Sequence, residues 1–142
     1  MYKEILLPID LNDVASQRKA VETAIALARA FGARVHVQTI VPDFGMPLVA
    51  GYFPEDFEGK ALENANRALH DFVKQTFPDD VSVQHIVGHG SIYQEILACA
   101  KEIGADLIVM ASHRPDLADY LIGPNASRVT RHADCSVLVV RG

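Results

Sequence analysis

Short apolar segments alternate along the chain with longer segments that have helical periodicity. Val21, Ala24, Ile25 and Ala28 illustrate the helical pattern, because residues spaced by three and four positions share one face of a helix. Leu107–Ala111 illustrates the other pattern, a continuous apolar run typical of a strand buried on both faces. Further strands are predicted over 5–9, 34–41, 81–87 and 137–140, and further helices over 62–76, 92–103 and 124–132. The predicted order is therefore β-α-β-α-β-α-β-α-β.

Strict alternation of strands and helices predicts the fold class. It implies a five-stranded parallel sheet with right-handed crossovers and helices on both faces. A length of 142 residues fits one such unit, so we expect a single doubly wound α/β domain over residues 1–142. Ligands of these folds bind beyond the carboxyl ends of the strands, where the strand order reverses. The turns at that edge begin at Pro8, Val41, Gly88 and Ala111, and we expect the functional site among them.

Several residues predict where these elements begin and end. Gly32 provides a left-handed stop for the first helix, and Pro8 ends the first strand because it cannot donate to a ladder. Ser91 and Gln94 predict a capping box at the start of the third helix. Residues 42–59 contain three prolines, three glycines and several aromatic residues, which predicts a long loop. Such a loop is either a functional lid or contact surface, or a cap on the end of the core.

The composition narrows the class of protein. With 49% hydrophobic and 22% charged residues, the chain can bury a core and is not predicted to be disordered. Its net charge of −5 argues against binding to nucleic acid or an anionic membrane, and its apolar runs are too short to span a bilayer. The N-terminus shows no secretory pattern. Of the two cysteines, Cys99 lies on an apolar helix face and Cys135 precedes a strand, which predicts no disulfide framework. We expect a cytoplasmic protein.

Common catalytic and nucleotide signatures are missing from the sequence. The chain has no P-loop motif and no G-x-G-x-x-G after its first strand. Gly88-His89-Gly90-Ser91 is a glycine-rich turn before a helix, which is a weak signal for an anion site. A response regulator has the same element order, but here the third strand has no phosphorylatable Asp at its end. His113 has no carboxylate or second histidine at triad or metal spacing, so we expect neither an enzyme nor a resident metal site.

Four segments carry a resemblance to one known family. They are Ile5–Asp10, Ala105–Met110, Ala111–Ala126 and Arg131–Val140, so the similarity spans the chain. The chain resembles the universal stress proteins, and most of all the subgroup with Ser-His-Arg-Pro after the fourth strand. The resemblance implies a Rossmann-like fold of the adenine-nucleotide alpha hydrolase type. It also implies an ATP-binding regulatory protein of the stress response that acts as a homodimer or higher oligomer.

Nucleotide-binding members of that family carry Gly-x-x-Gly, nine residues, and then Gly-Ser or Gly-Thr, which bind the phosphates. In this chain Ala111 and Arg114 take the first two glycine positions and Gly123 takes the third, with eight residues between Arg114 and Gly123. Pro124 takes the position of the hydroxyl residue, which is a departure from the pattern. Proline is favoured as the first residue of a helix, but here it removes one N–H and one hydroxyl from the phosphate site.

The remaining donors still predict a nucleotide site, which we expect to be weakened or altered. The N–H groups of Asn125 and Ala126 remain for a phosphate, and Arg114 adds a bidentate charged donor. Asp10 either lies against the ribose and phosphates, with Mg²⁺ as a possible bridge, or forms a local Asx cap. The resemblance implies ATP, or else AMP or ADP, as the ligand, with the backbone of Val41 against the adenine. The site residues it implies are Pro8, Ile9, Asp10, Val41, Met110, Ala111, Ser112, His113, Arg114, Gly123, Pro124, Asn125 and Ala126.

The last strand predicts a partner. Val137, Leu138, Val139 and Val140 are apolar at four successive positions, and in the resembling family this strand lies at the sheet edge. An exposed apolar edge invites pairing, so we expect a symmetric homodimer through it. The alternative function is an interaction module of the same fold that binds no nucleotide, with Pro124 marking the loss of the site. A further alternative is slow hydrolysis of ATP, for which the sequence offers no dedicated catalytic base.

Overall fold

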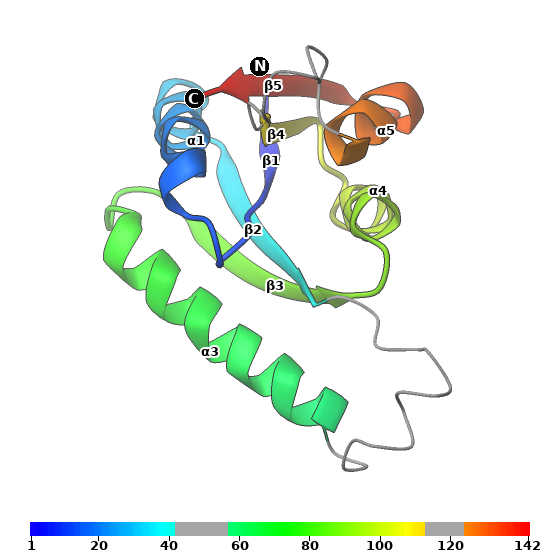
Figure 1. The fold of residues 1–142 in the computed structure, drawn as a ribbon. Coiled ribbons are helices and arrows are strands. Elements are labelled where there is room, and N and C mark those ends of the chain that lie inside the picture. Colours follow the sequence, from blue (N-terminus) through cyan, green and yellow to red (C-terminus); the bar gives the residue numbers. More distant parts are fainter. Residues whose placement is uncertain (42–56, 113–123) are drawn as a thin grey trace.

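A central parallel sheet organises the molecule (Figure 1). The computed structural model describes residues 1–41, 57–112 and 124–142. The strands are hydrogen-bonded in the order β3-β2-β1-β4-β5, and these neighbours pair in parallel. Their bounds are β1 (Glu4–Pro8), β2 (Arg34–Val41), β3 (Val83–His89), β4 (Leu107–Ser112) and β5 (Ser136–Arg141). The predicted doubly wound, five-stranded α/β fold is confirmed.

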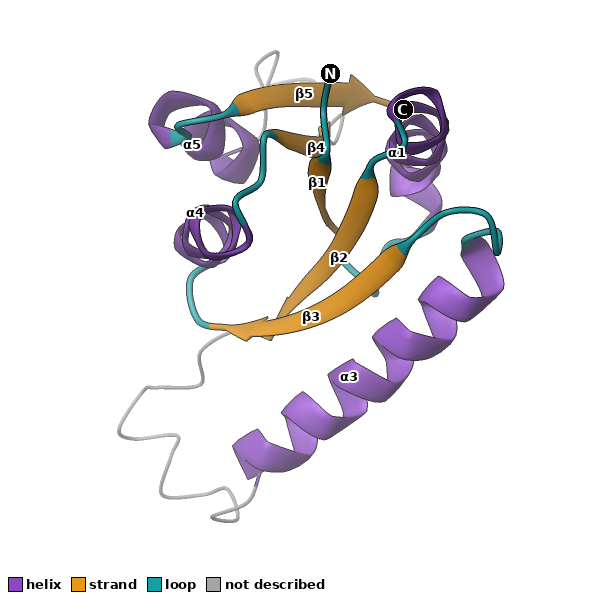
Figure 2. Ribbon diagram, turned by 180° about the vertical axis from the view of Figure 1, so that it is seen from behind, coloured by secondary structure: helices purple, strands orange, loops and turns teal. Residues whose placement is uncertain are grey.

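Helices cover both faces of the sheet. Figure 2 shows α1 and α3 on one side, and α4 and α5 on the other. Successive side chains of a strand point to opposite faces, so each strand contributes to two layers of core. Leu7 and Val37 lie in the layer under α1 and α3, whereas Leu6, Ile108 and Met110 lie in the layer under α4 and α5. The helices are η1 (Ala15–Gln17), α1 (Arg18–Phe31), α3 (Phe57–Thr76), α4 (Ile92–Ile103) and α5 (Pro124–His132).

The strand order reverses between β1 and β4, and this reversal positions the site. β1 pairs with β2 on one side and with β4 on the other. The chain leaves β1 toward α1 on one face of the sheet and leaves β4 toward α5 on the opposite face. Connections that diverge in this way leave a crevice at the carboxyl ends of the two strands.

The predicted element ends agree with the structure to within one residue, except at β3 and at the start of α3. Pro8 ends β1, and Gly32 ends α1 in the left-handed conformation at φ 65°. β3 begins two residues later than predicted, because the Val81 N–H bonds to the Pro78 carbonyl in a turn (3.2 Å). It also continues through His89, so the predicted glycine-rich turn is partly strand. α3 begins at Phe57, so the expected loop was three residues too long, and its remainder over 42–56 lies outside the described residues.

The predicted capping box at the start of α4 is wrong. Ser91 is the N-cap residue with extended backbone, but its side chain makes no capping hydrogen bond. Gln94 instead donates from Nε2 to the Tyr93 hydroxyl (3.3 Å). The carboxylate of Glu95 reaches back toward the strand, where its Oε1 accepts from the His89 N–H (3.2 Å). An acidic group in the first turn suits the positive end of the helix dipole.

Candidate nucleotide site

A cavity of about 310 Å³ lies at the carboxyl ends of β1 and β4, where the strand order reverses. Its volume is in the range of small-molecule sites. The predicted site residues that line it are Pro8, Ile9, Asp10, Met110, Ala111, Ser112, Pro124, Asn125 and Ala126. The fold therefore brings together three segments that are far apart in the sequence: the end of β1, the end of β4 and the start of α5.

The loop after β1 is held in place by Gln17, a buried residue just before α1. Its Oε1 accepts from the Asp10 N–H (2.8 Å), and its Nε2 donates to the carbonyls of Asp10 (2.8 Å) and Asp13 (2.6 Å). Burying an amide is favourable only when its groups are bonded, and here each bond goes to the loop. Gln17 thus fixes the backbone that forms one side of the cavity.

Asp10 is exposed at the mouth of this cavity, and it forms a local turn. Its Oδ1 accepts from the Asn12 N–H (2.9 Å), which is an Asx turn. This turn lies within the loop and is not the predicted cap of the following helix, because the N-cap residues are Val14 for η1 and Gln17 for α1. It engages one carboxylate oxygen, and the residue also lines the cavity, so the turn and a contact with ligand are compatible.

The start of α5 forms a polar side of the cavity. Pro124 is the first helical residue, as predicted, and Asn125 and Ala126 follow it along the cavity wall. The first N–H groups of a helix have no partner within the helix, and the dipole places partial positive charge there. A phosphate is the kind of group that this end of a helix binds.

The side of the cavity under α4 is mostly apolar, and sequence reasoning missed it. Ile40 of β2 and Ile92 and Ile96 of α4 line this side. Among them lies Gln38 of β2, which is 1% exposed. The signal is present in the sequence, because Val35, Val37, Thr39 and Val41 occupy alternate positions of β2 and Gln38 therefore lies on the opposite face. Asn12 and Gln17 are further lining residues that the sequence did not indicate.

Among the described residues, one predicted site residue, Val41, does not line the cavity. Val41 lies at the end of β2, is buried, and accepts from the Gly90 N–H through its carbonyl (3.0 Å). Its backbone oxygen is thus already engaged by the turn after β3. His113, Arg114 and Gly123 lie outside the described residues.

The described titratable groups show no nucleophile or metal centre. Burial raises the pKa of the Cys99 thiol to about 11, and it also raises the pKa of Cys135. A raised pKa leaves little thiolate at neutral pH, so neither thiol is activated. Across residues 1–41, 57–112 and 124–142, no three His, Cys, Asp or Glu side chains are grouped in a way that could hold a metal ion. No helix within these ranges is long and apolar enough to cross a membrane.

Comparison with known proteins agrees with the fold. The model of the universal stress protein family matches residues 1–141. The chain belongs to the universal stress protein family. Universal stress protein G of Shigella flexneri is 35% identical over 144 residues, covering 99% of this chain and 100% of that protein. Universal stress protein MJ0531 of Methanocaldococcus jannaschii is 32% identical, covering 99% of this chain and 83% of its own length.

Solved structures of universal stress proteins share the fold. Hypothetical protein MJ0577, from a study that assigned its biochemical function from structure, superposes with a TM-score of 0.81 at 25% identity over 100% of this chain and 97% of its own. A universal stress protein in complex with cAMP has a TM-score of 0.64 at 23% identity, and one from Archaeoglobus fulgidus in complex with dAMP has 0.65 at 18%. Each spans 99% of this chain, and they cover 97% and 98% of their own chains. At these identities the two complexes show a common fold.

Proposed function

We propose that this protein is an adenine-nucleotide-binding regulator of the stress response, with ATP as its ligand, or else AMP or ADP. The observation that carries the proposal is the cavity at the strand-order reversal, which has a helix N-terminus on one side and an apolar wall on the other. The helix end suits phosphates, and the apolar wall suits an uncharged base. Two proteins of the same fold that bind cAMP and dAMP support an adenine ligand.

The residues present fit such a ligand. The phosphates would lie at the N–H groups of Asn125 and Ala126, and Pro8, Ile9 and Met110 would contact the rest of the nucleotide. Asp10 would meet the ribose, or a Mg²⁺ carried by the phosphates. A single carboxylate together with phosphate oxygens is a common way for proteins to hold Mg²⁺.

The proposed role is regulatory and not enzymatic. Among the described lining residues, the one ionisable carboxylate is that of Asp10. Binding energy in the site would thus serve to shift the protein between nucleotide-free and nucleotide-bound forms. We place this activity in the cytoplasm, in keeping with the free thiols of Cys99 and Cys135.

Copurified ligand tests the proposed function most directly. Protein purified without added nucleotide and then denatured should release material with the ultraviolet spectrum and chromatographic retention of an adenine nucleotide. Protein stripped of that material should bind ATP in a calorimetric titration. If stripped protein gives no heat with ATP, AMP or ADP, the alternative of an interaction module that binds no nucleotide is correct, and Pro124 marks the loss of the site.

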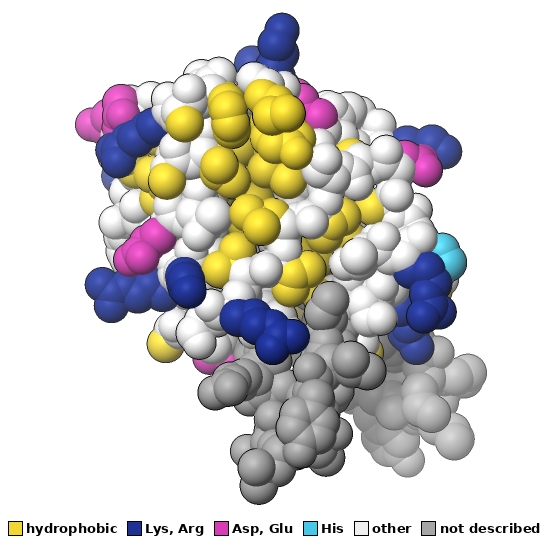
Figure 3. Space-filling model, turned by 90° about the horizontal axis from the view of Figure 1, so that it is seen from above, with side chains coloured by type: hydrophobic (Ala, Val, Ile, Leu, Met, Phe, Trp, Pro, Cys, Tyr) yellow, Lys and Arg dark blue, Asp and Glu magenta, His cyan; other side chains and the backbone are white. Residues whose placement is uncertain are grey.

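A homodimer through β5 is the second part of the proposal. β5 pairs with β4 on one side, and no other described strand pairs with its outer edge. Figure 3 views this side of the molecule and shows hydrophobic side chains gathered across it, with charged side chains at the margin. Leu138 of β5 is 38% exposed. A two-fold copy pairing along the same strand would cover both the apolar side chains and the free backbone groups.

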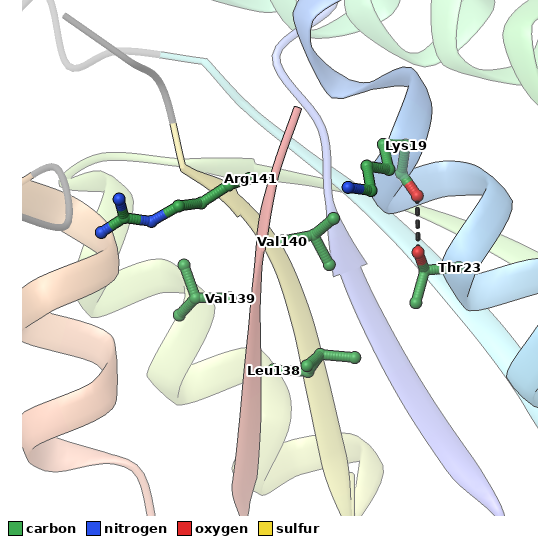
Figure 4. Close-up of a pocket in the computed structure, with 6 residues that line it drawn as sticks. All are labelled: Lys19, Thr23, Leu138, Val139, Val140 and Arg141. Carbon is green, nitrogen blue, oxygen red and sulfur yellow. Dashed lines mark hydrogen bonds between the residues drawn. The ribbon is translucent and has the colours of Figure 1, made fainter.

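Figure 4 shows the groove beside β5, where Leu138 and Val140 point toward α1, and Val139 and Arg141 point away from it. Val140 is already buried in the core of its own chain. A charge at Val140 would therefore disturb folding as well as assembly, which makes Leu138 the better position for a test.

Light scattering tests the dimer. The unsubstituted protein at micromolar concentration should have a mass of about twice the chain mass of 15.5 kDa. Leu138→Lys should give the monomer mass with an unchanged circular dichroism spectrum. The exposed strand residue Gln84 of β3 provides the matched control Gln84→Lys, which should leave the dimer intact. A monomeric unsubstituted protein would refute the dimer.

A further inference from the structure

Gln38 is a buried amide whose hydrogen bonds are incomplete. It is 1% exposed in the middle of β2 and lines the cavity. Its Nε2 donates to the backbone carbonyl of Glu95 in α4 (3.2 Å). Its Oε1 is also buried and has no hydrogen-bond partner among the described residues. Most buried polar atoms are bonded, so an unpaired acceptor in a cavity wall calls for an explanation.

The surroundings of Gln38 decide which end of its amide faces α4. The donor bond to Glu95 requires Nε2 on the α4 side, because a carbonyl cannot pair with Oε1. Gly88 of β3 leaves the space for this arrangement, since a Cβ at that position would lie 3.2 Å from Nε2. The Gln38 backbone carbonyl is also occupied, by the Ile9 N–H (2.7 Å). Oε1 is therefore the acceptor of Gln38 that is left for a ligand.

The position of Gln38 in the sheet indicates which part of a nucleotide it would meet. It lies on β2, bonds to Glu95 of α4, and shares the apolar side of the cavity with Ile40 and Ile96. The helix end that suits phosphate is on α5, which packs against β4 and β5. β2 and β4 are separated by β1, so the two sides are about two strand spacings apart, or roughly 10 Å. With phosphates at α5, the base is the part that reaches Gln38.

We propose that Gln38 determines the base specificity of this cavity, by accepting a hydrogen bond through Oε1 from the exocyclic amino group of adenine. This inference rests on the proposed function. The terminal torsion of a glutamine is broad, and a small rotation about it turns the covered Oε1 toward the ligand. Hypoxanthine carries a carbonyl in place of that amino group. Its oxygen and Gln38 Oε1 would both be acceptors, so no hydrogen bond could form between them.

Nucleotide pairs that differ only at this group test the inference. Unsubstituted protein should bind AMP roughly ten- to hundredfold more tightly than IMP. This difference in affinity corresponds to the cost of leaving one buried acceptor without a hydrogen bond. Purine riboside 5′-monophosphate, which lacks the amino group, should bind more weakly than AMP as well. This series needs no variant, so it stands even if a substitution at Gln38 prevents folding.

Gln38→Met provides the matching variant, because it keeps the length of the side chain without an acceptor. Its affinities for AMP and IMP should come within about threefold of each other, while the control Gln84→Met on the exposed side of β3 should keep the full preference. If Gln38 had only a structural role, Gln38→Met would weaken the binding of both nucleotides equally and leave the ratio of their affinities unchanged.

The outcomes separate this inference from the proposed function. Equal affinity of the unsubstituted protein for AMP and IMP overturns the role of Gln38 while nucleotide binding stands, and it is also the result expected if Oε1 meets a ribose hydroxyl. A preference that survives in Gln38→Met overturns it too. If neither nucleotide binds to the unsubstituted protein, the proposed function fails and this inference fails with it.

Discussion

Replacing Pro124 with Ser should tighten the binding of ATP. Pro124 is the first residue of α5 and lines the cavity, so in the proposed complex it would lie at the helix end that faces the phosphates. Proline has no N–H, whereas serine would add one backbone donor and one hydroxyl at that point. Hydrogen bonds to charged groups are worth about 1.5–3 kcal/mol each in net terms. Because the N–H and the hydroxyl belong to one residue and would act on the same phosphate, their contributions do not add in full. We expect a total gain of about 1–3 kcal/mol, or roughly five- to hundredfold in affinity.

A second variant divides this gain between the two donors. Pro124→Ala restores the N–H without the hydroxyl, so its affinity for ATP should lie between those of the unsubstituted protein and Pro124→Ser. Losing proline increases the freedom of the unfolded chain and costs about 0.4–1 kcal/mol of stability. That cost lowers the melting temperature of both variants and does not change the affinity of the folded protein.

Calorimetric titration with ATP and with adenosine measures the effect. Adenosine lacks phosphates, so its affinity should be the same in all three proteins. Equal affinity of the unsubstituted protein and Pro124→Ser for ATP would refute the reasoning, because it would mean that phosphates do not lie at the start of α5. A parallel gain for adenosine would refute it as well, since the substitution would then act through the shape of the cavity.

Three further predictions concern a charge, a thiol and a core residue. If Arg114 pairs with phosphate, Arg114→Ala should weaken the binding of ATP far more than the binding of adenosine. Equal losses of affinity for the two ligands in a calorimetric titration would assign Arg114 a structural role. Because burial raises the pKa of Cys99 to about 11 from an unfolded value near 9.0, the free energy of unfolding should fall as pH rises from 9 to 11. Denaturant unfolding should show a shallower fall in Cys99→Ala, and an identical pH dependence would contradict this assignment. Leu69 is the fully buried contact of α3 with the core, so Leu69→Ala should cost about 2–5 kcal/mol of stability. Ala68 is exposed on the same helix, and Ala68→Ser should change the unfolding free energy by no more than about 0.5 kcal/mol.

The sequence alone carried enough information for the fold and for much of the site. Apolar periodicity is a local property, and it distinguished the strands from the helices because a buried strand and a one-sided helix place their apolar residues differently. Alternation then implied a parallel sheet, and the reversal of strand order implied where a ligand lies. For this reason Pro8, Asp10, Ser112 and Asn125 could be assigned to one site although they lie far apart in the chain.

Tertiary structure alone decided how the individual polar groups are used. The sequence pattern at Ser91 and Gln94 fits a capping box, but Glu95 is the residue that reaches back, because the strand end at His89 offers it an N–H. Gln38 looked like an ordinary strand residue until α4 and β3 enclosed it and engaged one end of its amide. Val140 belongs to the same apolar run as Leu138, yet it is buried by its own chain while Leu138 is exposed. Hydrogen bonds and burial depend on which distant segments come into contact, and the local sequence does not determine those contacts.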